Sequence, residues 1–373
     1  MTYLLLILSF LTALHVSNGF VATKIKTEST RLNLGSMEGC VAVVTGASRG
    51  IGKGIAIELG KAGAIVYVTG TSTNDVDMKS GGGRYSTNDE VGGPGSIEET
   101  ANQVTQAGGL GIPVYCNHAD DEQVKNLFEL VENNHGRLDL LVNNVFRVPQ
   151  GGTEALFGNF WEKDIEVWDS IHTVGCRSHY VASCHAVPLM KKNRPFGKSE
   201  MKRPMIAMIS SFGGLCYTFN VAYGVGKAAV DRMAKDMAVE LEKEDIACMS
   251  FWPGVVLTER TQISVENGDW DKDVGIPLDN AETPGYTGKA IVAVATDKDN
   301  MSKSGKYHVV AELAKDYGFK DENDKQPPSI RSLRFLIPAY GLDENTRDKV
   351  PLDLIPDWKI PFFIMANGKP PDK

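Results

Sequence analysis

The chain has 373 residues, of which 42% are hydrophobic and 23% are charged, as is usual for a globular protein that buries a large core. Its formal net charge of −8 argues against a nucleic-acid partner, because that binding is usually driven by a basic surface. The six cysteines are scattered, with no Cys-x-x-Cys pair, so the sequence favours neither a disulfide scaffold nor a zinc site, and we expect no metal ion.

The N-terminal segment resembles a leader. Residues 3–14 form an apolar run that is too short to span a membrane, which takes about 20 residues. Ser17 and Gly19 suit a cleavage site after Gly19, so residues 1–19 are predicted to be a signal-peptide-like segment that directs the chain into the secretory pathway. Residues 20–36, rich in Ser and Thr, are either a transit-like segment or a disordered spacer. The destination stays open between the endoplasmic reticulum and a complex plastid.

After the leader, two kinds of pattern alternate. Short runs rich in apolar and β-branched residues predict strands at 40–46, 64–70, 112–117, 138–144, 204–211 and 247–254. Amphipathic segments predict helices at 51–62, 97–107, 121–133, 167–190 and 222–244. This alternation is typical of an α/β fold with a doubly wound parallel sheet of the Rossmann type. We therefore expect a single domain over residues 37–320.

Two segments stand apart from this pattern. The glycine-rich stretch at 74–95 is predicted to be a solvated, flexible insertion, because no strand feeds it directly and no helix follows at once. Residues 321–373 are predicted to be a C-terminal extension whose apolar runs are too short to cross a bilayer. We expect the extension to pack on the core or on a partner subunit; a substrate lid or a membrane-surface contact is the alternative.

The first predicted strand leads through a glycine-rich turn into a helix. Glycines let the backbone turn tightly and approach a pyrophosphate, and the helix N-terminus offers free N–H groups and positive dipole charge. The strand–turn–helix context therefore predicts a dinucleotide site with the candidate ligands Gly46, Ser48, Arg49, Gly50, Ile51 and Gly52.

The end of the second predicted strand bears on the type of dinucleotide. An acid at this point would bind the ribose hydroxyls of NAD, but the sequence has Thr71 and no acid there. Arg49 supplies a cation suited to a 2′-phosphate. The sequence therefore favours NADP(H) over NAD(H), unless Arg49 only packs against the surface.

Three further residues predict proton-transfer chemistry. Tyr223 and Lys227 are four residues apart, on one face of a predicted helix. An unperturbed Tyr has a pKa of about 10, and a neighbouring ammonium lowers that pKa by favouring the phenolate. Ser211 lies twelve residues before Tyr223, just past the fifth predicted strand, where its hydroxyl can hydrogen-bond a reacting oxygen.

These motifs resemble, in order, those of the short-chain dehydrogenase/reductase family. The resemblance covers roughly residues 39–318, and several segments within it are similar to one particular member. It implies that Tyr223 is the general acid/base, that Lys227 lowers the pKa of Tyr223 and holds the nicotinamide ribose, and that Ser211 orients the carbonyl. By the same resemblance, the residues that contact the cofactor further along the chain are Asn117, Asn144, Pro253, Gly254 and Thr258, together with Tyr223 and Lys227.

Two departures from the family pattern stand out. The family's Asn-Asn-Ala-Gly run ends here in Val145 and Phe146, and the fourth member of the family's catalytic tetrad, an Asn, is replaced by Gly175. In relatives that Asn holds a water largely through its main-chain carbonyl, which glycine keeps. We therefore expect the proton relay to survive and Gly175→Asn to be tolerated, unless the site needs a backbone conformation that only glycine adopts.

The sequence thus predicts a single catalytic domain that acts as an NADP(H)-dependent oxidoreductase. It would reduce the carbonyl of a small molecule, or oxidise the alcohol, by hydride transfer. An NAD-linked alcohol dehydrogenase and a non-catalytic nicotinamide-binding redox sensor are the alternatives, although the intact Ser211, Tyr223 and Lys227 argue against the sensor. The histidines at 172, 179 and 185 are predicted to be structural. Homo-oligomers and membrane-surface contact stay open.

Overall fold

The computed structural model describes residues 34–74, 84–85, 95–149, 155–192, 196–268, 270, 276–342, 344–347 and 350–367. The predicted segment 1–19 and most of 20–36 lie outside the described residues, as does most of the glycine-rich insertion at 74–95. Within the described part of the chain, no helix has the length and apolar character needed to cross a membrane.

A seven-stranded parallel sheet forms the centre of the protein, with the strand order β5-β2-β1-β6-β7-β8-β9. The prediction of a doubly wound α/β fold is confirmed, and six of the seven strands fall on predicted segments. The strands are β1 (Val41–Val44), β2 (Ile65–Gly70), β5 (Leu110–Tyr115), β6 (Leu140–Asn143), β7 (Met205–Ile209), β8 (Ala247–Trp252) and β9 (Tyr307–Val309). A separate two-stranded pair joins β3 (Ser72–Thr73) to β4 (Arg84–Tyr85).

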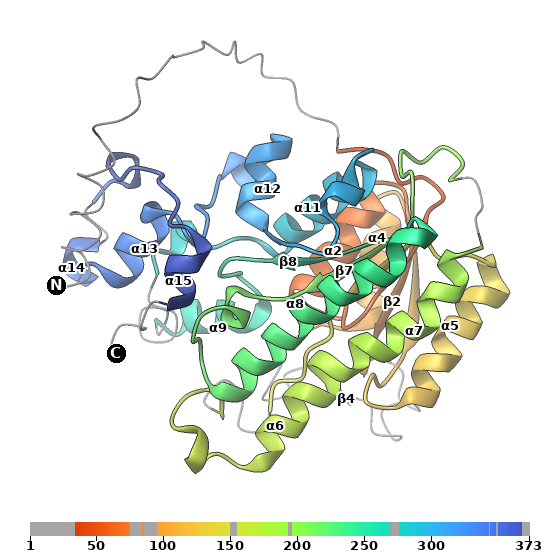
Figure 1. The fold of residues 1–373 in the computed structure, drawn as a ribbon, viewed down its shortest axis with the longest axis horizontal. Coiled ribbons are helices and arrows are strands. Elements are labelled where there is room, and N and C mark those ends of the chain that lie inside the picture. The colour runs from red at the N-terminus through yellow and green to blue at the C-terminus, as the bar shows by residue number, and fades with distance from the viewer. Residues whose placement is uncertain are drawn as a thin grey trace, which may run out of the picture.

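Helices cover both faces of the sheet (Figure 1). One apolar cluster joins the sheet to α2 (Gly50–Lys61), α4 (Ile97–Gln106) and α11 (Pro284–Thr296). A second cluster joins the opposite face to α5 (Asp121–His135), α7 (Ser178–Met190) and α8 (Val221–Leu241). Burial on both faces explains why the central strands β1, β6, β7 and β8 are almost continuously apolar rather than alternating.

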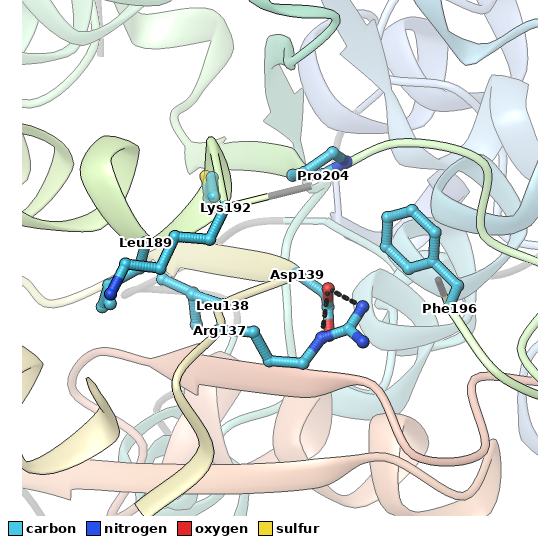
Figure 2. A pocket seen from close by; sticks show the side chains of 8 residues that line it. Arg137, Leu138, Asp139, Leu189, Lys192, Phe196 and Pro204 are labelled. Atoms are coloured by element: carbon cyan, nitrogen blue, oxygen red, sulfur yellow. Dashed lines mark hydrogen bonds and ion pairs between the residues drawn. The ribbon is translucent and has the colours of Figure 1, made fainter. Parts of the chain in front are cut away.

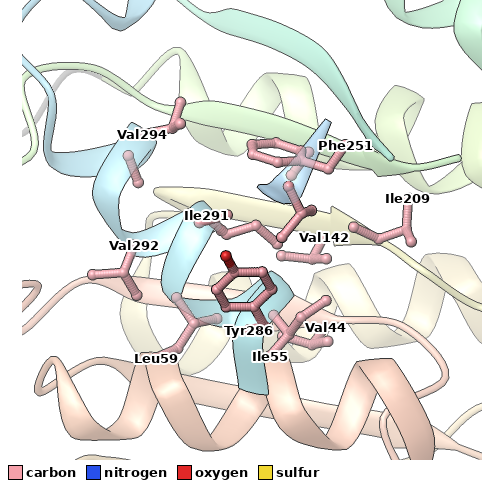
Figure 3. Packing of buried hydrophobic residues seen from close by; sticks show 14 of the residues in the cluster. Val44, Ile55, Leu59, Val142, Ile209, Phe251, Tyr286, Ile291, Val292 and Val294 are labelled. Carbon is pink, nitrogen blue, oxygen red and sulfur yellow. The ribbon is translucent and has the colours of Figure 1, made fainter. Parts of the chain in front are cut away.

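The packing of α11 on α2 fixes the position of the glycine-rich turn. Figure 3 shows the Tyr286 ring of α11 beside Ile55 and Leu59 of α2, over the sheet residues. The two helices approach closely because Gly54 has no side chain: a Cβ there would lie 2.2 Å from the carbonyl carbon of Pro284. Since α2 begins at Gly50, this contact holds the N-terminus of α2 at the end of β1.

The helix predicted at 167–190 is interrupted. It consists of α6 (Ile165–His172), a π-helical turn at Thr173–Arg177, and α7. The hydroxyl of Ser178 donates to the Val174 carbonyl oxygen at 2.6 Å, within the irregular turn. Such π-turns are frequent at functional sites, and this one contains Gly175, a position at which the sequence departs from the pattern of the family that it resembles.

The remaining elements lie beyond β8 or between the main helices. The helices are α9 (Glu259–Glu266), α12 (Val310–Tyr317), α13 (Leu333–Tyr340), α14 (Glu344–Arg347) and α15 (Phe362–Asn367). The 3-10 turns are Phe160–Glu162, Phe212–Gly214, Glu242–Glu244, Leu278–Asn280, Asn300–Lys303, Glu322–Asp324 and Leu352–Leu354.

The described part of the C-terminal extension packs on the core. Phe362 of α15 contacts the rings of Trp252 and Tyr307, with centroid distances of 5.7 and 5.1 Å. Two segments of the extension also bond each other through their main chains: the Leu333 N–H donates to the Trp358 carbonyl oxygen at 2.9 Å, and the Ile360 N–H donates to the Arg331 carbonyl oxygen at 2.8 Å. The sequence-based expectation was packing on the core or on a partner subunit, and these contacts are with the core.

Candidate active site

The predicted catalytic side chains meet where β7 ends and α8 begins. Ser211 follows β7 by two residues, and Tyr223 and Lys227 lie on the first two turns of α8. The helix starts at this point because the side chain of Asn220 accepts the Tyr223 N–H at 2.8 Å and so caps the helix.

Ser211 and Tyr223 lie beside each other. The Ser211 hydroxyl is near enough to the Tyr223 phenol to oppose the rise in its pKa, and it accepts the Gly213 N–H at 3.1 Å, which holds it beside the ring. Gly213 leaves room for this arrangement, since a Cβ there would lie 2.7 Å from Tyr223 Cε1. The structure therefore brings together the serine and the tyrosine that the sequence predicted to act as a pair.

Lys227 is buried beneath Tyr223. Its Nζ atom donates to the Ile209 carbonyl oxygen at 3.1 Å and lies 5.9 Å from the centre of the Tyr223 ring. Burial lowers the pKa of Lys227 to about 8, opposed by the charge of Asp231. Burial raises the pKa of Tyr223, opposed by the Ser211 hydrogen bond. That Lys227 lowers the pKa of Tyr223, as the resemblance implies, stays a prediction.

Asp231 is a site residue that the sequence reasoning missed. It lies one helical turn beyond Lys227 on α8, and its half-buried carboxylate accepts the indole N–H of Trp252 at 3.0 and 3.2 Å. Burial raises the pKa of Asp231, opposed by this hydrogen bond among others. The four-residue spacing of Lys227 and Asp231 on one helix face was a visible signal for the pair.

The glycine-rich turn has the geometry that the sequence predicted. Gly46 and Gly50 have φ angles of +64° and +58°, which strongly favour glycine. A Cβ on Gly52 would lie only 2.3 Å from the Gly46 carbonyl oxygen. The Asn144 amide donates to the carbonyl oxygens of Thr45 and Gly46 at 2.8 and 3.0 Å, so Asn144 stabilises the turn from the floor of the site.

The N-terminus of α2 already binds an anionic group. The Gly50 N–H donates to the Glu259 carboxylate at 2.7 Å, and the neighbouring Thr258 caps α9 and lies within 3.5 Å of a Cβ built on Gly50. A carboxylate here is a stand-in for phosphate, because both match the free N–H groups and the dipole of a helix N-terminus. The residues present therefore fit the pyrophosphate of a dinucleotide; Glu259 was not foreseen.

The far end of the cofactor site contains both a cation and an acid. The Arg49 guanidinium donates to the Gly95 carbonyl oxygen at 3.0 Å. Thr71 directly follows β2, as expected, but the Glu98 carboxylate of α4 accepts the Thr73 hydroxyl and, at 3.0 Å, the Asn74 N–H. The sequence shows no acid at the end of β2. In the folded protein, however, Glu98 of α4 contacts Thr73, three residues beyond the last residue of β2.

Asn117 follows β5, where the sequence placed it. Its N–H donates to the Gln123 side chain at 2.9 Å, and its side-chain oxygen accepts the Ala119 N–H at 3.2 Å. Arg147, which was also missed, donates to the same oxygen at 3.4 Å. Asn117 is therefore tied into the loop after β5, beside a cation that comes from the end of β6.

Pro253 and Gly254 follow β8 and pack on a buried acid. A Cβ on Gly254 would lie 2.8 Å from Oε1 of Glu282, whose side chain is 1% exposed. Burial raises the pKa of Glu282 to about 8, opposed by the Gly254 N–H. The main chain of Glu282 also bonds that of Val255 and Leu257, both at 2.8 Å, so this residue supports the loop that leads to Thr258.

The histidines have structural contacts. His179 is buried, its Nε2 lies 3.0 Å from the Val145 carbonyl oxygen, and burial lowers its pKa to about 3, so the ring is neutral at physiological pH. His172 contacts the Ala222 carbonyl oxygen at 2.9 Å, and His185 stacks on Phe128. Among the described residues, no group of three or more His, Cys, Asp or Glu could hold a metal ion. All six cysteines are free.

A small surface hollow lies away from these residues (Figure 2). It is lined by residues 137–139, just before β6, and by Pro204, just before β7, so it faces the opposite end of the strands from Ser211. Two of its charged residues, Arg137 and Asp139, pair with each other at 2.6 Å, and Asp139 also accepts the Val41 N–H at 2.8 Å. These contacts link β6 to β1, and we assign the hollow a structural role.

Known proteins share sequence similarity with most of this chain. A family model described as Enoyl-(Acyl carrier protein) reductase matches residues 46–311. The chain is 38% identical over 334 residues to Dehydrogenase/reductase SDR family member 1 of Mus musculus, covering 88% of this chain and 97% of the relative. It is 28% identical over 282 residues to a 7alpha-hydroxysteroid dehydrogenase of Clostridium sardiniense, covering 74% and 93% of the two chains.

Solved structures agree on the fold. A putative dehydrogenase from Xanthomonas campestris superposes with a TM-score of 0.61 at 20% identity, covering 78% of this chain and 94% of the other. A short-chain type dehydrogenase/reductase from Mycobacterium marinum gives 0.57 at 22% identity, with coverages of 74% and 94%. With the family match and the 38% identical relative, the chain belongs to the short-chain dehydrogenase/reductase family of oxidoreductases, whose fold binds a nicotinamide cofactor.

Proposed function

We propose that this protein is an NADP(H)-dependent reductase that converts a small-molecule carbonyl to an alcohol, or catalyses the reverse reaction. The observation that carries the proposal is that Ser211 and Tyr223 lie together above the buried Lys227. A redox sensor has no need for these three groups, whereas carbonyl reduction needs a proton donor, a hydroxyl that orients the oxygen, and a cation beneath the donor.

Each side chain has a separate part in this reaction. When bound, the reduced nicotinamide supplies the hydride. Tyr223 donates its phenolic proton to the substrate oxygen, and Ser211 holds that oxygen by a hydrogen bond. Lys227, held by the Ile209 carbonyl, stabilises the phenolate that remains on Tyr223. In the oxidation direction, the same phenolate accepts the proton of the alcohol.

The preference for NADP(H) rests on Arg49 and on the absence of an acid at Thr71. The Ala47 N–H donates to the Thr69 carbonyl oxygen at 2.8 Å, so the glycine-rich turn and the end of β2 lie side by side. A 2′-phosphate bound between them would be within reach of the Arg49 guanidinium. The Glu98 carboxylate, which accepts the Thr73 hydroxyl, opposes the preference for NADP(H). Rates measured with NADPH and with NADH show whether Arg49 or Glu98 has the larger effect.

The substrate is proposed to be apolar. Aromatic rings pack in sequence beside the phenol. The centre of the Phe219 ring lies 4.9 Å from that of Tyr223, and the centre of the Phe157 ring lies 5.5 Å from that of Phe219. Such a lining favours a carbonyl on a hydrophobic framework. Because one relative is a 7alpha-hydroxysteroid dehydrogenase, ketosteroids belong in the substrate panel.

A carbonyl screen tests the proposal. The purified protein is incubated with NADPH or NADH and a panel of ketosteroids, aromatic ketones and aliphatic aldehydes, and cofactor oxidation is followed at 340 nm. We expect turnover with at least one apolar carbonyl and faster turnover with NADPH. Binding of NADPH without turnover on the panel or on the corresponding alcohols would support the sensor, and faster turnover with NADH would support the NAD-linked enzyme.

A separate proposal concerns the role of the predicted leader in targeting the chain. We propose that residues 1–19 direct the chain into the secretory pathway, because a short apolar run precedes small residues at a cleavage site. Residues 1–36 fused to a fluorescent protein should localise to the endoplasmic reticulum or, in a cell with a complex plastid, to the plastid. A diffuse cytosolic signal would contradict the assignment.

A further inference from the structure

The two departures from the family pattern are in contact with each other. Gly175, in the π-helical turn, faces the ring of Phe146, which follows β6. A Cβ on Gly175 would lie 2.8 Å from Cδ2 and 3.3 Å from Cε2 of Phe146, closer than side chains normally pack. Gly175 does not have a positive φ angle, so position 175 does not need the conformational freedom of glycine. What excludes a side chain there is the Phe146 ring.

The same ring contacts the catalytic pair. The Lys227 Nζ atom lies over the Phe146 ring at 5.2 Å from its centre, within the range of a cation–π interaction. The Phe146 and Tyr223 rings meet edge to face, with centroids 6.0 Å apart and an interplanar angle of 80°. Phe146 therefore contacts Lys227 and Tyr223 on one side and Gly175 on the other.

We propose that Phe146 is a positioning residue for the Tyr223–Lys227 pair, and that it keeps its place because position 175 carries no side chain. The inference deepens the proposed function, since the pair is the proton-transfer machinery of that reaction. It also changes the expectation for Gly175→Asn. The substitution is tolerated only when Phe146 is replaced as well.

Several other groups surround the Lys227 ammonium. On α8 these are the Tyr223 phenol and the Asp231 carboxylate. The π-turn contributes the Cys176 thiol, α7 contributes His179, and β7 contributes the Ile209 carbonyl. His179 is neutral and the Asp231 carboxylate raises the pKa of Lys227, so the face of Phe146 adds to the groups that favour the charged amine. Removing the ring should therefore lower the pH at which Lys227 loses its proton.

The steric half of the proposal is tested by a thermal double-mutant cycle. Melting temperatures are measured for the wild type, Gly175→Asn, Phe146→Ala and the double variant. We expect Gly175→Asn to lower the melting temperature in the wild-type background and to have a much smaller effect in the Phe146→Ala background. An equal effect in both backgrounds would overturn the steric half. No enzymatic activity enters this measurement.

The positioning half is tested by the titration of Lys227. Protein labelled with ¹³C-lysine is titrated by NMR, and Lys227→Arg identifies the signal. Phe146→Leu keeps much of the apolar bulk but removes the π-face, so the Lys227 midpoint should fall by about half a unit to one unit. Gly175→Ala, which displaces the ring without replacing it, should lower the midpoint in the same direction. Unchanged midpoints in both variants would overturn the proposal.

Activity then separates this proposal from the proposed function. If the wild type reduces no carbonyl, the proposed function fails, but the thermal cycle and the Lys227 titration still decide the role of Phe146. If the wild type is active, Phe146→Leu should lower kcat more than it raises KM, and the alkaline fall of the pH profile should move to lower pH together with the NMR midpoint. A profile that stays in place while the midpoint moves would contradict a role for Phe146 in proton transfer.

Discussion

The Asp231 carboxylate accepts the indole N–H of Trp252 at 3.0 and 3.2 Å, which holds a negative charge one helical turn beyond Lys227. This charge raises the pKa of Lys227, while burial lowers that pKa to about 8. The ammonium is therefore lost as the pH rises through about 8, and carbonyl reduction should slow in the same range. Asp231→Asn removes the opposing charge, so the fall should begin at lower pH, by roughly half a unit to one unit.

Steady-state rates from about pH 6 to pH 10 measure this shift. The matched control is Asp236→Asn, which removes an exposed carboxylate from the same helix, where it pairs with Arg232. The control should leave the alkaline limb where the wild type has it. If both variants shift the limb equally, general surface charge rather than the Asp231 contact is responsible.

Tyr223→Phe removes the proton donor and keeps the ring. Turnover should fall by about 10²–10⁴-fold, the usual contribution of general acid–base catalysis. NADPH binding, measured by cofactor fluorescence, should change little, because the glycine-rich turn is formed by other residues. Near wild-type turnover would refute the assignment of Tyr223 as the acid.

Arg49→Ala should separate the two cofactors. If the guanidinium binds the 2′-phosphate, the Kd for NADPH rises by roughly 10- to 100-fold, and the Kd for NADH rises much less. The substitution also removes the hydrogen bond to the Gly95 carbonyl, which contributes with either cofactor. Titration with both cofactors distinguishes the two effects; equal losses would make Arg49 a structural residue.

Glu259→Gln tests the carboxylate at the start of α2. Glu259 accepts the Gly50 N–H at 2.7 Å, where the cofactor pyrophosphate is expected. Removing the charge should tighten NADPH and NADH alike, by roughly two- to five-fold, because the anion competing for the helix N-terminus is gone. Weaker binding of both cofactors would mean that Glu259 organises the site instead of competing for it.

Glu282→Gln should change the pH dependence of stability. Burial raises the pKa of Glu282 to about 8 from its usual 4.5, so the folded protein holds this proton where the unfolded chain has released it. The contribution of Glu282 to stability is complete below about pH 4.5 and is lost as the pH rises through about 8. The glutamine variant lacks this titration.

Thermal melting between about pH 5 and pH 9 makes the comparison. The melting temperature of the wild type should fall relative to that of Glu282→Gln up to about pH 8, and the two curves should run parallel above that pH. Glu240→Gln, which alters an exposed carboxylate on α8, is the control and should follow the wild type throughout. Parallel curves for Glu282→Gln and the wild type would refute the raised pKa.

The sequence predicted the strands that are long and continuously apolar, because burial on both faces leaves a clear pattern. It did not predict β9, whose three residues, Tyr307–Val309, pair with β8 at the edge of the sheet. The pattern around this short strand resembles that of many loops. Its pairing is decided by the neighbouring strand and not by its own sequence.

The residues of the candidate site also fall into two groups: those that the sequence predicted and those that only the structure revealed. Gly46, Ser211 and Tyr223 lie in short motifs, and their chemical roles can be predicted from the residues next to them in the sequence. Glu259 contacts Gly50 across 209 positions of the chain, and such a contact becomes visible only in the folded protein. The Phe146–Gly175 contact shows the point most clearly, since both residues stood out in the sequence but nothing there linked them.

The packing around Trp252 gives the protein an internal spectroscopic reporter. The indole is 1% exposed, stacks on Tyr307 at 4.1 Å between ring centres, and contacts Phe362 of α15. Three other tryptophans, at 161, 168 and 358, are between 42% and 69% exposed, and the fifth, Trp270, is 7% exposed. In a variant that lacks Trp270, emission from Trp252 should therefore be blue-shifted and protected from a soluble quencher such as iodide. Because its N–H binds Asp231, changes in that emission would report on the surroundings of Lys227 without an added label.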